Sequence, residues 1–179
     1  RQLVVYLGLL ADYQGIPQLL EAAAYLRQRD YPVSFLVMGF PGEEKYRMQA
    51  ERLGLRPPDV IFTGRTSYQQ APEWLALGDI GIAPKVSATE GSGKILNYMA
   101  MGLPTVAYDT KVSREYMGKL GIYAAPLGDA SALAQALALL LRNPEVGRIM
   151  GKQLRERARR HFSWERTGRQ LRRIYERVW

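Results

Sequence analysis

The stretch TEGSGKILNYMAMGLP, residues 89–104, decides the fold of this chain. Immediately before it, residues 79–84 read DIGIAP, a short apolar run ended by proline that is typical of a buried strand. After Gly93 the sequence predicts about two turns of helix, which Gly102 ends and Pro104 keeps from resuming. A glycine-rich loop therefore leads from a strand into the N-terminus of a helix.

Such a helix N-terminus favours an anion. Its first backbone N–H groups have no partner within the helix, and the positive end of the helix dipole lies there. Gly91 and Gly93 carry no side chain, so the backbone can approach a ligand closely. The sequence therefore predicts a phosphate or another anion at this loop.

Three side chains refine this prediction. Lys94 and Asn97 are three residues apart and share a helix face, and helical side chains tilt towards the N-terminus, so both should point back to the anion. Glu90 lies in the loop itself, where a carboxylate suits hydroxyl groups better than phosphate. A phosphate beside a hydroxyl-rich group describes a sugar nucleotide. The opposite helix face carries Leu96, Met99 and Ala100.

Two other interpretations of the loop compete with this one. Gly91 and Gly93 can simply shape a turn that binds nothing. Alternatively, a GxG pattern occurs in dinucleotide-binding sites. Here it lacks the third glycine of that pattern and lies in the middle of the chain rather than after the first strand, which disfavours an NAD site.

The composition is that of a water-soluble globular domain. The 179 residues suffice for one domain with a proper core. The chain has no cysteine, which excludes disulfides and thiolate chemistry, and its one histidine, His161, lies beside a basic helix end, where we expect a surface role. We expect neither a metal nor a cofactor. No apolar run is long enough to span a membrane, the N-terminus does not resemble a signal peptide, and a cytoplasmic location is expected.

The net charge of +8 lies entirely at the C-terminal end. Residues 142–179 carry twelve Lys and Arg against four Asp and Glu, whereas residues 1–141 carry thirteen of each kind. This excess suits an anionic membrane surface, such as the inner face of the cell membrane, an acidic partner domain, or solvent. Aromatic residues are not interleaved with these charges as they are in single-strand binders, so we expect no nucleic-acid partner.

Apolar runs alternate with helical patterns along most of the chain, which predicts a doubly wound, Rossmann-like parallel sheet of about six strands within one domain, residues 1–179. The expected strands are residues 3–7, 33–38, 60–62, 80–84, 105–108 and 122–124. The expected helices before the C-terminal region are 16–28, 43–53, 68–77, the helix after Gly93, and 113–120. Ligands of such sheets bind at the carboxyl ends of the strands, where Gly8, Gly39, Gly64-Arg65 and residues 84–93 fall.

Three helices close the chain. They are expected from about residue 130 to 141, from 144 to about 160, and from Ser163, which caps the last one. The last helix has an apolar stripe at helical spacing, and we expect these residues to contact the core rather than to form a ligand cage. The stripe consists of Trp164, Thr167, Leu171, Ile174, Tyr175 and Val178.

The order of these motifs resembles one family over nearly the whole chain, the C-terminal, nucleotide-sugar-binding half of the retaining GT-B glycosyltransferases of group 1, family GT4. The matching segments are YLGLLADYQGIPQLLEAAAYL, FLVMGFPGEEKYRMQAERLGL, VIFTGRTSYQQAPEWLALGDIGIAP, EGSGKILNYMAMGLPTVAYD, PLGDASALAQALALLLRNPE and HFSWER. The resemblance implies one half of a two-domain enzyme, with the acceptor-binding N-terminal domain outside this chain. It implies a nucleoside diphosphate sugar as the donor substrate.

The family's glutamate-glycine-aromatic-glycine loop matches residues 90–93, and Glu90 would therefore contact the donor sugar. Arg65 matches a position near the nucleotide base, and Gly8 a glycine beside the donor. Lys94 joins Glu90 as an expected catalytic residue because it would hold the diphosphate leaving group. The full set of expected donor-binding residues is Gly8, Gln14, Arg65, Glu90, Gly91, Ser92, Gly93, Lys94, Ile95 and Asn97.

Three positions depart from the family pattern. Leu9 stands where an arginine is usual, Gln14 where a lysine is usual, and both of those usual residues bind the diphosphate. Asn97 replaces a glutamate that holds the ribose. Two hypotheses follow. The first is a working donor-binding domain of a hexosyltransferase-type enzyme, which should be inactive without its other half. The alternative is a non-catalytic binding or scaffold module of the same fold.

Overall fold

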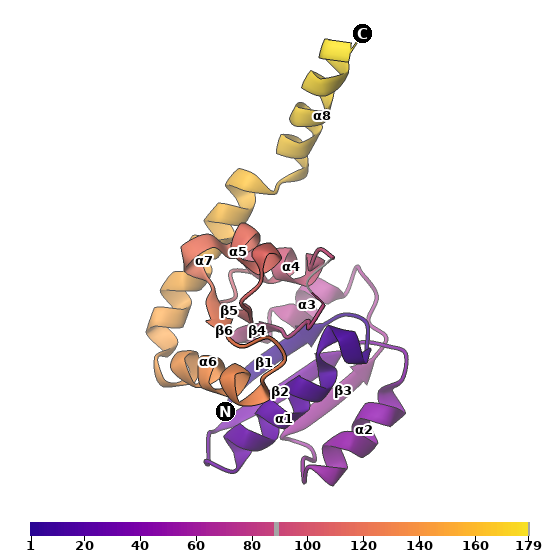
Figure 1. Cartoon of the computed structure of the whole chain (residues 1–179), viewed down its shortest axis with the longest axis vertical. Coiled ribbons are helices and arrows are strands. Elements are labelled where there is room, and N and C mark those ends of the chain that lie inside the picture. Colours follow the sequence, from indigo (N-terminus) through magenta and orange to yellow (C-terminus); the bar gives the residue numbers. More distant parts are fainter. Residues whose placement is uncertain (88–89, 179) are drawn as a thin grey trace.

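The computed structural model describes residues 1–87 and 90–178, so Thr89 of the quoted stretch lies outside the described residues. Six strands form one parallel sheet in the order β3-β2-β1-β4-β5-β6 (Figure 1). The strands are β1 (Gln2–Leu7), β2 (Val33–Met38), β3 (Val60–Gly64), β4 (Ile80–Ala83), β5 (Thr105–Tyr108) and β6 (Ile122–Ala124). The expected doubly wound Rossmann-like fold is confirmed.

Helices cover both faces of this sheet (Figure 1). One face is covered by α1 (Ile16–Arg27), α2 (Glu43–Arg52) and α6 (Ala130–Arg142). The other is covered by α3 (Ala71–Leu75), α4 (Gly93–Met101), α5 (Lys111–Met117) and α7 (Pro144–His161). Short 3₁₀ turns, Asp12–Gln14 and Gly118–Leu120, lie in two of the connections.

The pleat of β1 shows why its sequence is apolar throughout. Val4 and Tyr6 point into the core beneath α1 and α6, whereas Val5 points into the core beneath α4 and α7. All three side chains are fully buried. A strand covered on both faces needs apolar residues at every position rather than at alternate ones. The register pairs Val4 with Phe35 of β2 on one side and with Ile80 of β4 on the other.

The buried face of α4 is centred on Tyr98. Ile95, Tyr98 and Met99 are buried, Leu96 is partly buried against the same core, and Ala100, which shares a face with Leu96 and Met99, is exposed. The ring of Tyr98 sets this arrangement. Its hydroxyl accepts a hydrogen bond from the Leu7 N–H (2.9 Å) and donates one to the Ile82 carbonyl (3.1 Å). A satisfied polar tip makes full burial of a tyrosine favourable, and this sets the rotation of the helix.

The C-terminal helix α8 (Trp164–Val178) corrects a second expectation. Its apolar stripe was expected to contact the core, but none of the described residues of α8 is buried, and the side chain of Trp164 is 86% exposed. Figure 1 shows α8, in yellow, projecting away from the sheet and its covering helices. Helical spacing of apolar residues reveals an amphipathic helix, but it does not show what covers the apolar face.

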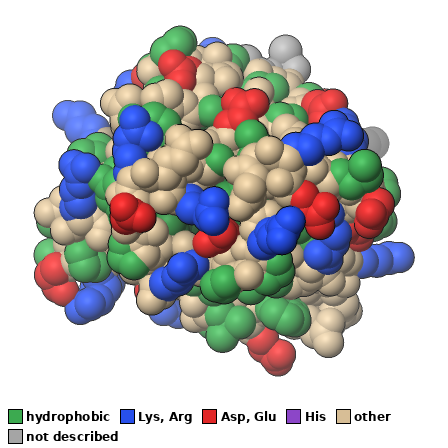
Figure 2. Space-filling model, turned by 90° about the horizontal axis from the view of Figure 1, so that it is seen from below, with side chains coloured by type: hydrophobic (Ala, Val, Ile, Leu, Met, Phe, Trp, Pro, Cys, Tyr) green, Lys and Arg blue, Asp and Glu red, His purple; other side chains and the backbone are tan. Residues whose placement is uncertain are grey.

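Two further findings concern the surface. Within residues 1–87 and 90–178, no helix is both long and apolar enough to cross a membrane. On the face opposite α8, basic and acidic side chains are interspersed without a patch of one sign (Figure 2). This agrees with the balanced charge of residues 1–141 and leaves the basic excess to the C-terminal helices.

Candidate functional site

The carboxyl ends of β1 to β6 meet at one edge of the sheet because all strand pairs are parallel. From β1 the chain continues to β2 on one side, and β4 flanks β1 on the other side. The helices that follow these strands, α1 and α4, therefore lie on opposite faces of the sheet, and we call the region between their N-termini the crevice. Ligands of open α/β sheets bind at this position, and the glycine-rich loop after β4 lies there.

The loops after β1 and β4 are interlocked. The Val86 N–H donates to the Tyr13 carbonyl at 3.0 Å. Gly15 has a φ of +81°, and a Cβ atom added there would lie 1.8 Å from the Pro84 carbonyl oxygen. Only glycine permits both the left-handed backbone and this close approach. The contact places Gln14, the residue before Gly15, beside the start of α4.

Lys94 is held inside the crevice by groups from three segments. Its Nζ donates to Gln14 Oε1 at 2.6 Å and lies 5.2 Å from the centre of the Tyr6 ring. A Cβ atom on Gly8 would lie 2.9 Å from Lys94 Cε, so the absence of a side chain at Gly8 leaves room for the lysine. Burial, and secondly the charge of nearby Lys85, lower the pKa of Lys94 to about 8. This ammonium has lost much of its water without gaining a carboxylate partner among the described residues, which favours a bound anion.

The N-terminus of α4 has no side-chain cap. Ser92 is the N-cap residue, but its side chain accepts no hydrogen bond from the helix. Its buried hydroxyl has no partner within the described part of the chain, although its exposed fraction is only 7%. Among described groups, none accepts from the N–H groups of Gly91, Gly93 and Lys94 either. Free amides and the positive end of the helix dipole therefore lie at the same end of α4 as Lys94, an arrangement that favours an anion.

Glu90 lies at the mouth of the crevice. Its side chain is 63% exposed, and its Oε2 lies 3.1 Å from the Nζ of Lys85. Lys85 is itself almost fully buried. The structure brings Lys85 into contact with the glycine-rich loop, at Glu90 and Gly91. Its spacing of five residues from Glu90 on an irregular loop gives no signal in the sequence.

The other expected site residues lie around this centre, and they differ in whether they offer a polar group to a ligand. Arg65 is exposed after β3, and its guanidinium lies 4.9 Å from the centre of the Phe40 ring. Beside Phe40, a hollow of about 220 Å³ is lined by residues of three loops, among them Gly8, Leu9 and Thr66. Leu9 is half-exposed in this hollow and brings no charge to it.

Two residues of α4 fit the expected site less well. The Ile95 side chain is buried in the core and its N–H donates to the Ser92 carbonyl at 3.0 Å, so Ile95 offers no free polar group to a ligand. Asn97 lines a separate apolar hollow of about 140 Å³ between α3 and α4, beside Tyr68 and Ala71. It shares a helix face with Lys94 but lies one turn further from the N-terminus of α4.

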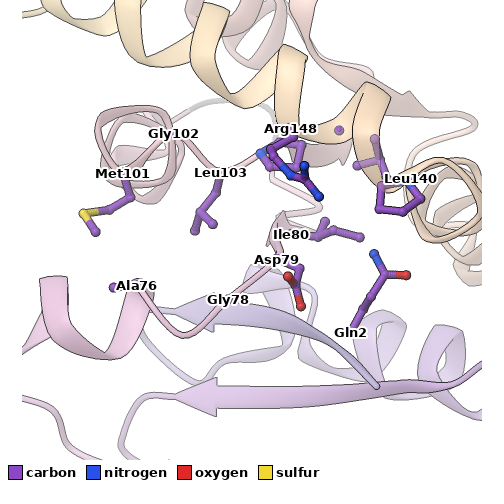
Figure 3. A pocket seen from close by; sticks show the side chains of 13 residues that line it. Gln2, Ala76, Gly78, Asp79, Ile80, Met101, Gly102, Leu103, Leu140 and Arg148 are labelled. Carbon is purple, nitrogen blue, oxygen red and sulfur yellow. The ribbon is translucent and has the colours of Figure 1, made fainter.

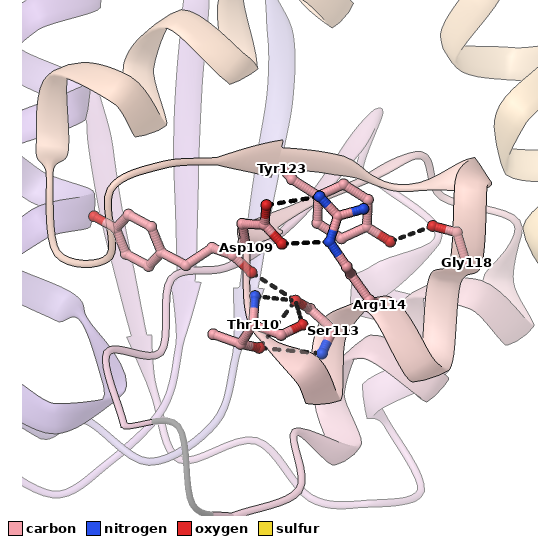
Figure 4. Close-up of polar contacts among 7 residues, drawn as sticks. Asp109, Thr110, Ser113, Arg114, Gly118 and Tyr123 are labelled. Atoms are coloured by element: carbon pink, nitrogen blue, oxygen red, sulfur yellow. Dashed lines mark hydrogen bonds and ion pairs between the residues drawn. The ribbon is translucent and has the colours of Figure 1, made fainter.

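The loop after β5 lies beside the glycine-rich loop, across a small hollow lined by Glu90, Ser92 and Thr110, and it carries a network that sequence reasoning missed (Figure 4). Thr110 caps α5 by accepting from the Ser113 N–H at 3.1 Å, and the Ser113 side chain accepts from the Thr110 N–H in return. Arg114 donates to Asp109 at 2.7 Å, and this hydrogen bond holds the pKa of the Asp109 carboxyl below its usual value. A threonine with a serine three residues later is a recognisable capping signal. These groups bond to one another and fix the loop.

A larger hollow, of about 330 Å³, lies at the opposite edge of the sheet (Figure 3). Its charged groups already have partners. The Asp79 carboxylate accepts from the Leu3 N–H at 2.7 Å, and Arg148 pairs with Glu145 at 2.6 Å. Among the described residues that line this hollow, no unpaired buried cation lies beside open helix amides. Its larger volume therefore does not make it a better anion site than the region around Lys94. Within the described ranges, no group of three His, Cys, Asp or Glu could hold a metal ion.

Comparison with known proteins shows the family and the fold. The family model "Glycosyl transferases group 1" matches residues 1–143. The chain is 30% identical over 178 residues to the phosphatidyl-myo-inositol mannosyltransferase of Mycobacterium leprae, covering 98% of this chain and 46% of that protein. The sucrose-phosphate synthase of Thermosynechococcus elongatus superposes with a TM-score of 0.86 at 25% identity, over 99% of this chain and 45% of that one. Anabaena Alr3699/HepE, solved in complex with UDP-glucose, gives 0.85 at 20% identity, over 97% and 48%.

A doubly wound parallel sheet, with its loops meeting at the topological switch point, defines the class of protein as a Rossmann-like α/β domain. Within that class, the chain belongs to the group 1 glycosyltransferases, family GT4, and has the fold of the C-terminal domain of the GT-B architecture. The chain spans about half the length of the curated relative described above.

Proposed function

We propose that this domain binds the nucleoside diphosphate sugar of a retaining hexosyltransferase. The diphosphate would lie between the Lys94 ammonium and the open amides at the start of α4, and Glu90 would hold hydroxyl groups of the sugar. The nucleotide base would lie towards Arg65. The single observation that carries this proposal is the position of Lys94, a partly buried ammonium beside Gly8 and Gln14 with no acidic partner among the described residues.

The chemistry of transfer fits this arrangement. When the bond between the sugar and the diphosphate breaks, negative charge builds up on the leaving diphosphate. An ammonium and fixed backbone N–H groups stabilise that charge without having to reorganise, which lowers the barrier. The Anabaena structure of the same fold, which holds UDP-glucose, supports a nucleoside diphosphate sugar as the ligand class.

The acceptor would bind to a part of the protein outside this chain. The chain covers 46% of its mannosyltransferase relative, and α8 offers an unpartnered stripe that includes Leu171 and Ile174. We propose that this stripe packs against that other half, and that the 179-residue chain binds the donor without transferring its sugar. The competing possibility is that the stripe lies on the cytoplasmic surface of a membrane, which the five arginines of α8 would favour. Binding of the isolated chain to vesicles of anionic lipid tests this possibility.

Calorimetry with UDP, GDP, ADP and UDP-glucose tests the donor site. Lys94→Met should weaken binding about 10- to 150-fold, the value of one hydrogen bond to a charged group. Glu90→Ala should weaken UDP-glucose more than UDP, because the carboxylate faces the sugar. Lys152→Met, the same change on the exposed side of α7, should change neither affinity. A wild-type chain that binds none of the four ligands at millimolar concentration would refute the proposal.

The alternative is a non-catalytic module, and three substitutions in the sequence support it. Leu9, Gln14 and Asn97 replace charged residues that the family uses for the donor. If the module binds no nucleotide, its melting temperature should not change when UDP, GDP, ADP or UDP-glucose is added. A ligand at 100 times its dissociation constant would instead stabilise the fold by about 2.7 kcal/mol, which is easily measured.

A further inference from the structure

Lys85 has an arrangement that the proposed donor site does not yet explain. It follows β4 directly after Pro84, and only 5% of the side chain is exposed. Its Nζ donates to the Glu90 carbonyl (3.0 Å), the Glu90 carboxylate (3.1 Å) and the Gly91 carbonyl (3.3 Å). An ammonium has three hydrogens to donate. All three are used on two consecutive residues of the glycine-rich loop, so Lys85 has none left for a ligand.

These contacts determine where the neighbouring amides point. In a trans peptide the C=O of one residue and the N–H of the next point in opposite directions. The Glu90–Gly91 and Gly91–Ser92 peptides are not among the cis bonds of the chain. With the carbonyls of Glu90 and Gly91 turned inwards to Lys85, the N–H groups of Gly91 and Ser92 must point away from it. No described group accepts from these two N–H groups.

The direction of these amides matters because they continue the open end of α4. The N–H groups of Gly91 and Ser92 precede those of Gly93 and Lys94 in the chain, and the Ser92 side chain caps none of them. The charge of Lys85 also lies near enough to Lys94 to contribute to its lowered pKa. Lys85 therefore lies on the side of the loop to which the carbonyls point, whereas Lys94 lies on the side that faces the crevice.

We propose that Lys85 is a positioning residue of the donor site, which holds the carbonyls of Glu90 and Gly91 so that the amides of Gly91 and Ser92 face the diphosphate. This inference rests on the proposed function, and it deepens it by naming the group that orients the anion-binding backbone. Through its ion pair, Lys85 also fixes the carboxylate of Glu90 at the mouth of the crevice. Lys85 makes no contact with the ligand itself.

Amide resonances of the ¹⁵N-labelled 179-residue chain test this inference without any substitution. Titration with inorganic pyrophosphate, and separately with UDP, should shift the Gly91 and Ser92 amide protons downfield, as expected when these amides donate to phosphate. If calorimetry shows binding and these two resonances do not move, the inference is wrong while the proposed function stands. If neither ligand binds, the proposed function itself fails.

Lys85→Met then tests the role of the ammonium, since methionine keeps an apolar stem of similar length and removes all three donors. The variant should bind pyrophosphate and UDP about tenfold or more weakly, and the Gly91 and Ser92 shifts should disappear. Lys85→Arg, which retains the charge and the donors, should restore both. Glu90→Gln removes only the ion pair and should keep the amide shifts. Unchanged affinity with unchanged amide shifts in a folded Lys85→Met protein would overturn the proposal, whereas Lys152→Met serves as the surface control.

Discussion

The ammonium of Lys94 lies 2.6 Å from the side-chain oxygen of Gln14, although the two residues are 80 positions apart in the chain. The family resemblance places a diphosphate-binding lysine at position 14, where this chain has a neutral glutamine. We propose that Lys94 supplies from α4 the positive charge that the first loop has lost. Gln14 then acts as the acceptor that holds the ammonium in place.

The lowered pKa of Lys94 predicts how donor binding depends on pH. Diphosphate attracts the charged ammonium, so UDP affinity should be constant between about pH 7 and 8 and should fall about tenfold per pH unit above the folded-state pKa of about 8. Binding near pH 8.5 should take up protons, which calorimetry in two buffers of different ionisation enthalpy measures. Lys94→Met should abolish both the decrease and the proton uptake. A wild-type affinity that stays flat up to pH 10 would contradict this assignment.

The same pKa shift has a consequence for stability with the opposite sign. Because the folded-state pKa of Lys94 is lower than the unfolded value of about 10.5, the unfolded chain binds more protons between about pH 8 and 10.5. The contribution of Lys94 to the free energy of unfolding should therefore rise with pH across this window. Urea unfolding of wild type and Lys94→Met at pH 7.5 and pH 9.5 measures it. The difference between the two proteins should favour Lys94→Met more at the lower pH.

A double-mutant cycle tests whether Gln14 acts through Lys94. Gln14→Leu should weaken UDP binding in the wild-type background, because the ammonium loses its fixed acceptor. In the Lys94→Met background the same change should have almost no effect, giving a coupling energy of about 0.5–3 kcal/mol. Equal effects in both backgrounds would show that Gln14 binds the ligand independently of Lys94.

The sequence predicted the sheet well because buried strands have a local signature. Val33–Met38 is a continuous apolar run between turn residues, and β2 has these bounds. The order of strands and helices then fixed the edge at which the loops meet, so Gly8 and Lys94 could be assigned to one crevice. Asn97 shows the limit, since a shared helix face did not place it beside the N-terminus of α4.

Other features could not be predicted because they depend on contacts between distant segments. The partner of Lys94 lies in the first loop, and the three acceptors of Lys85 depend on the path of an irregular loop. The rotation of α4 depends on the missing side chain of Gly81, where an added Cβ would lie 2.6 Å from the Tyr98 ring. Such close packing is decided in three dimensions, and helical periodicity fixes a face only to within about one residue.

Gly15 and Gly128 make a matched pair for testing the interlocked loops. Both have a left-handed backbone, with φ values of +81° and +86°, so alanine should cost about 1–2 kcal/mol at either position from backbone strain alone. At Gly15 the added Cβ would also meet the Pro84 carbonyl at 1.8 Å, whereas nothing lies within 4 Å at Gly128. Gly15→Ala should therefore cost about 1–3 kcal/mol more, from overpacking. Urea unfolding measures both, and equal costs would mean that the loop after β4 moves freely away.

Leu154 of α7 and Leu171 of α8 test which helix belongs to the core of this chain. Leu154 is fully buried and Leu171 is 53% exposed. Leu154→Ala should lower the free energy of unfolding by about 2–5 kcal/mol, because it leaves a cavity in the core that α7 shares with α4. Leu171→Ala should change it by less than about 0.5 kcal/mol, as a substitution at an exposed site does. Chemical unfolding followed by far-UV circular dichroism compares the two variants. A loss at Leu171 as large as that at Leu154 would show that α8 folds back onto this domain, and its apolar stripe would then not be free to pack against another part of the protein.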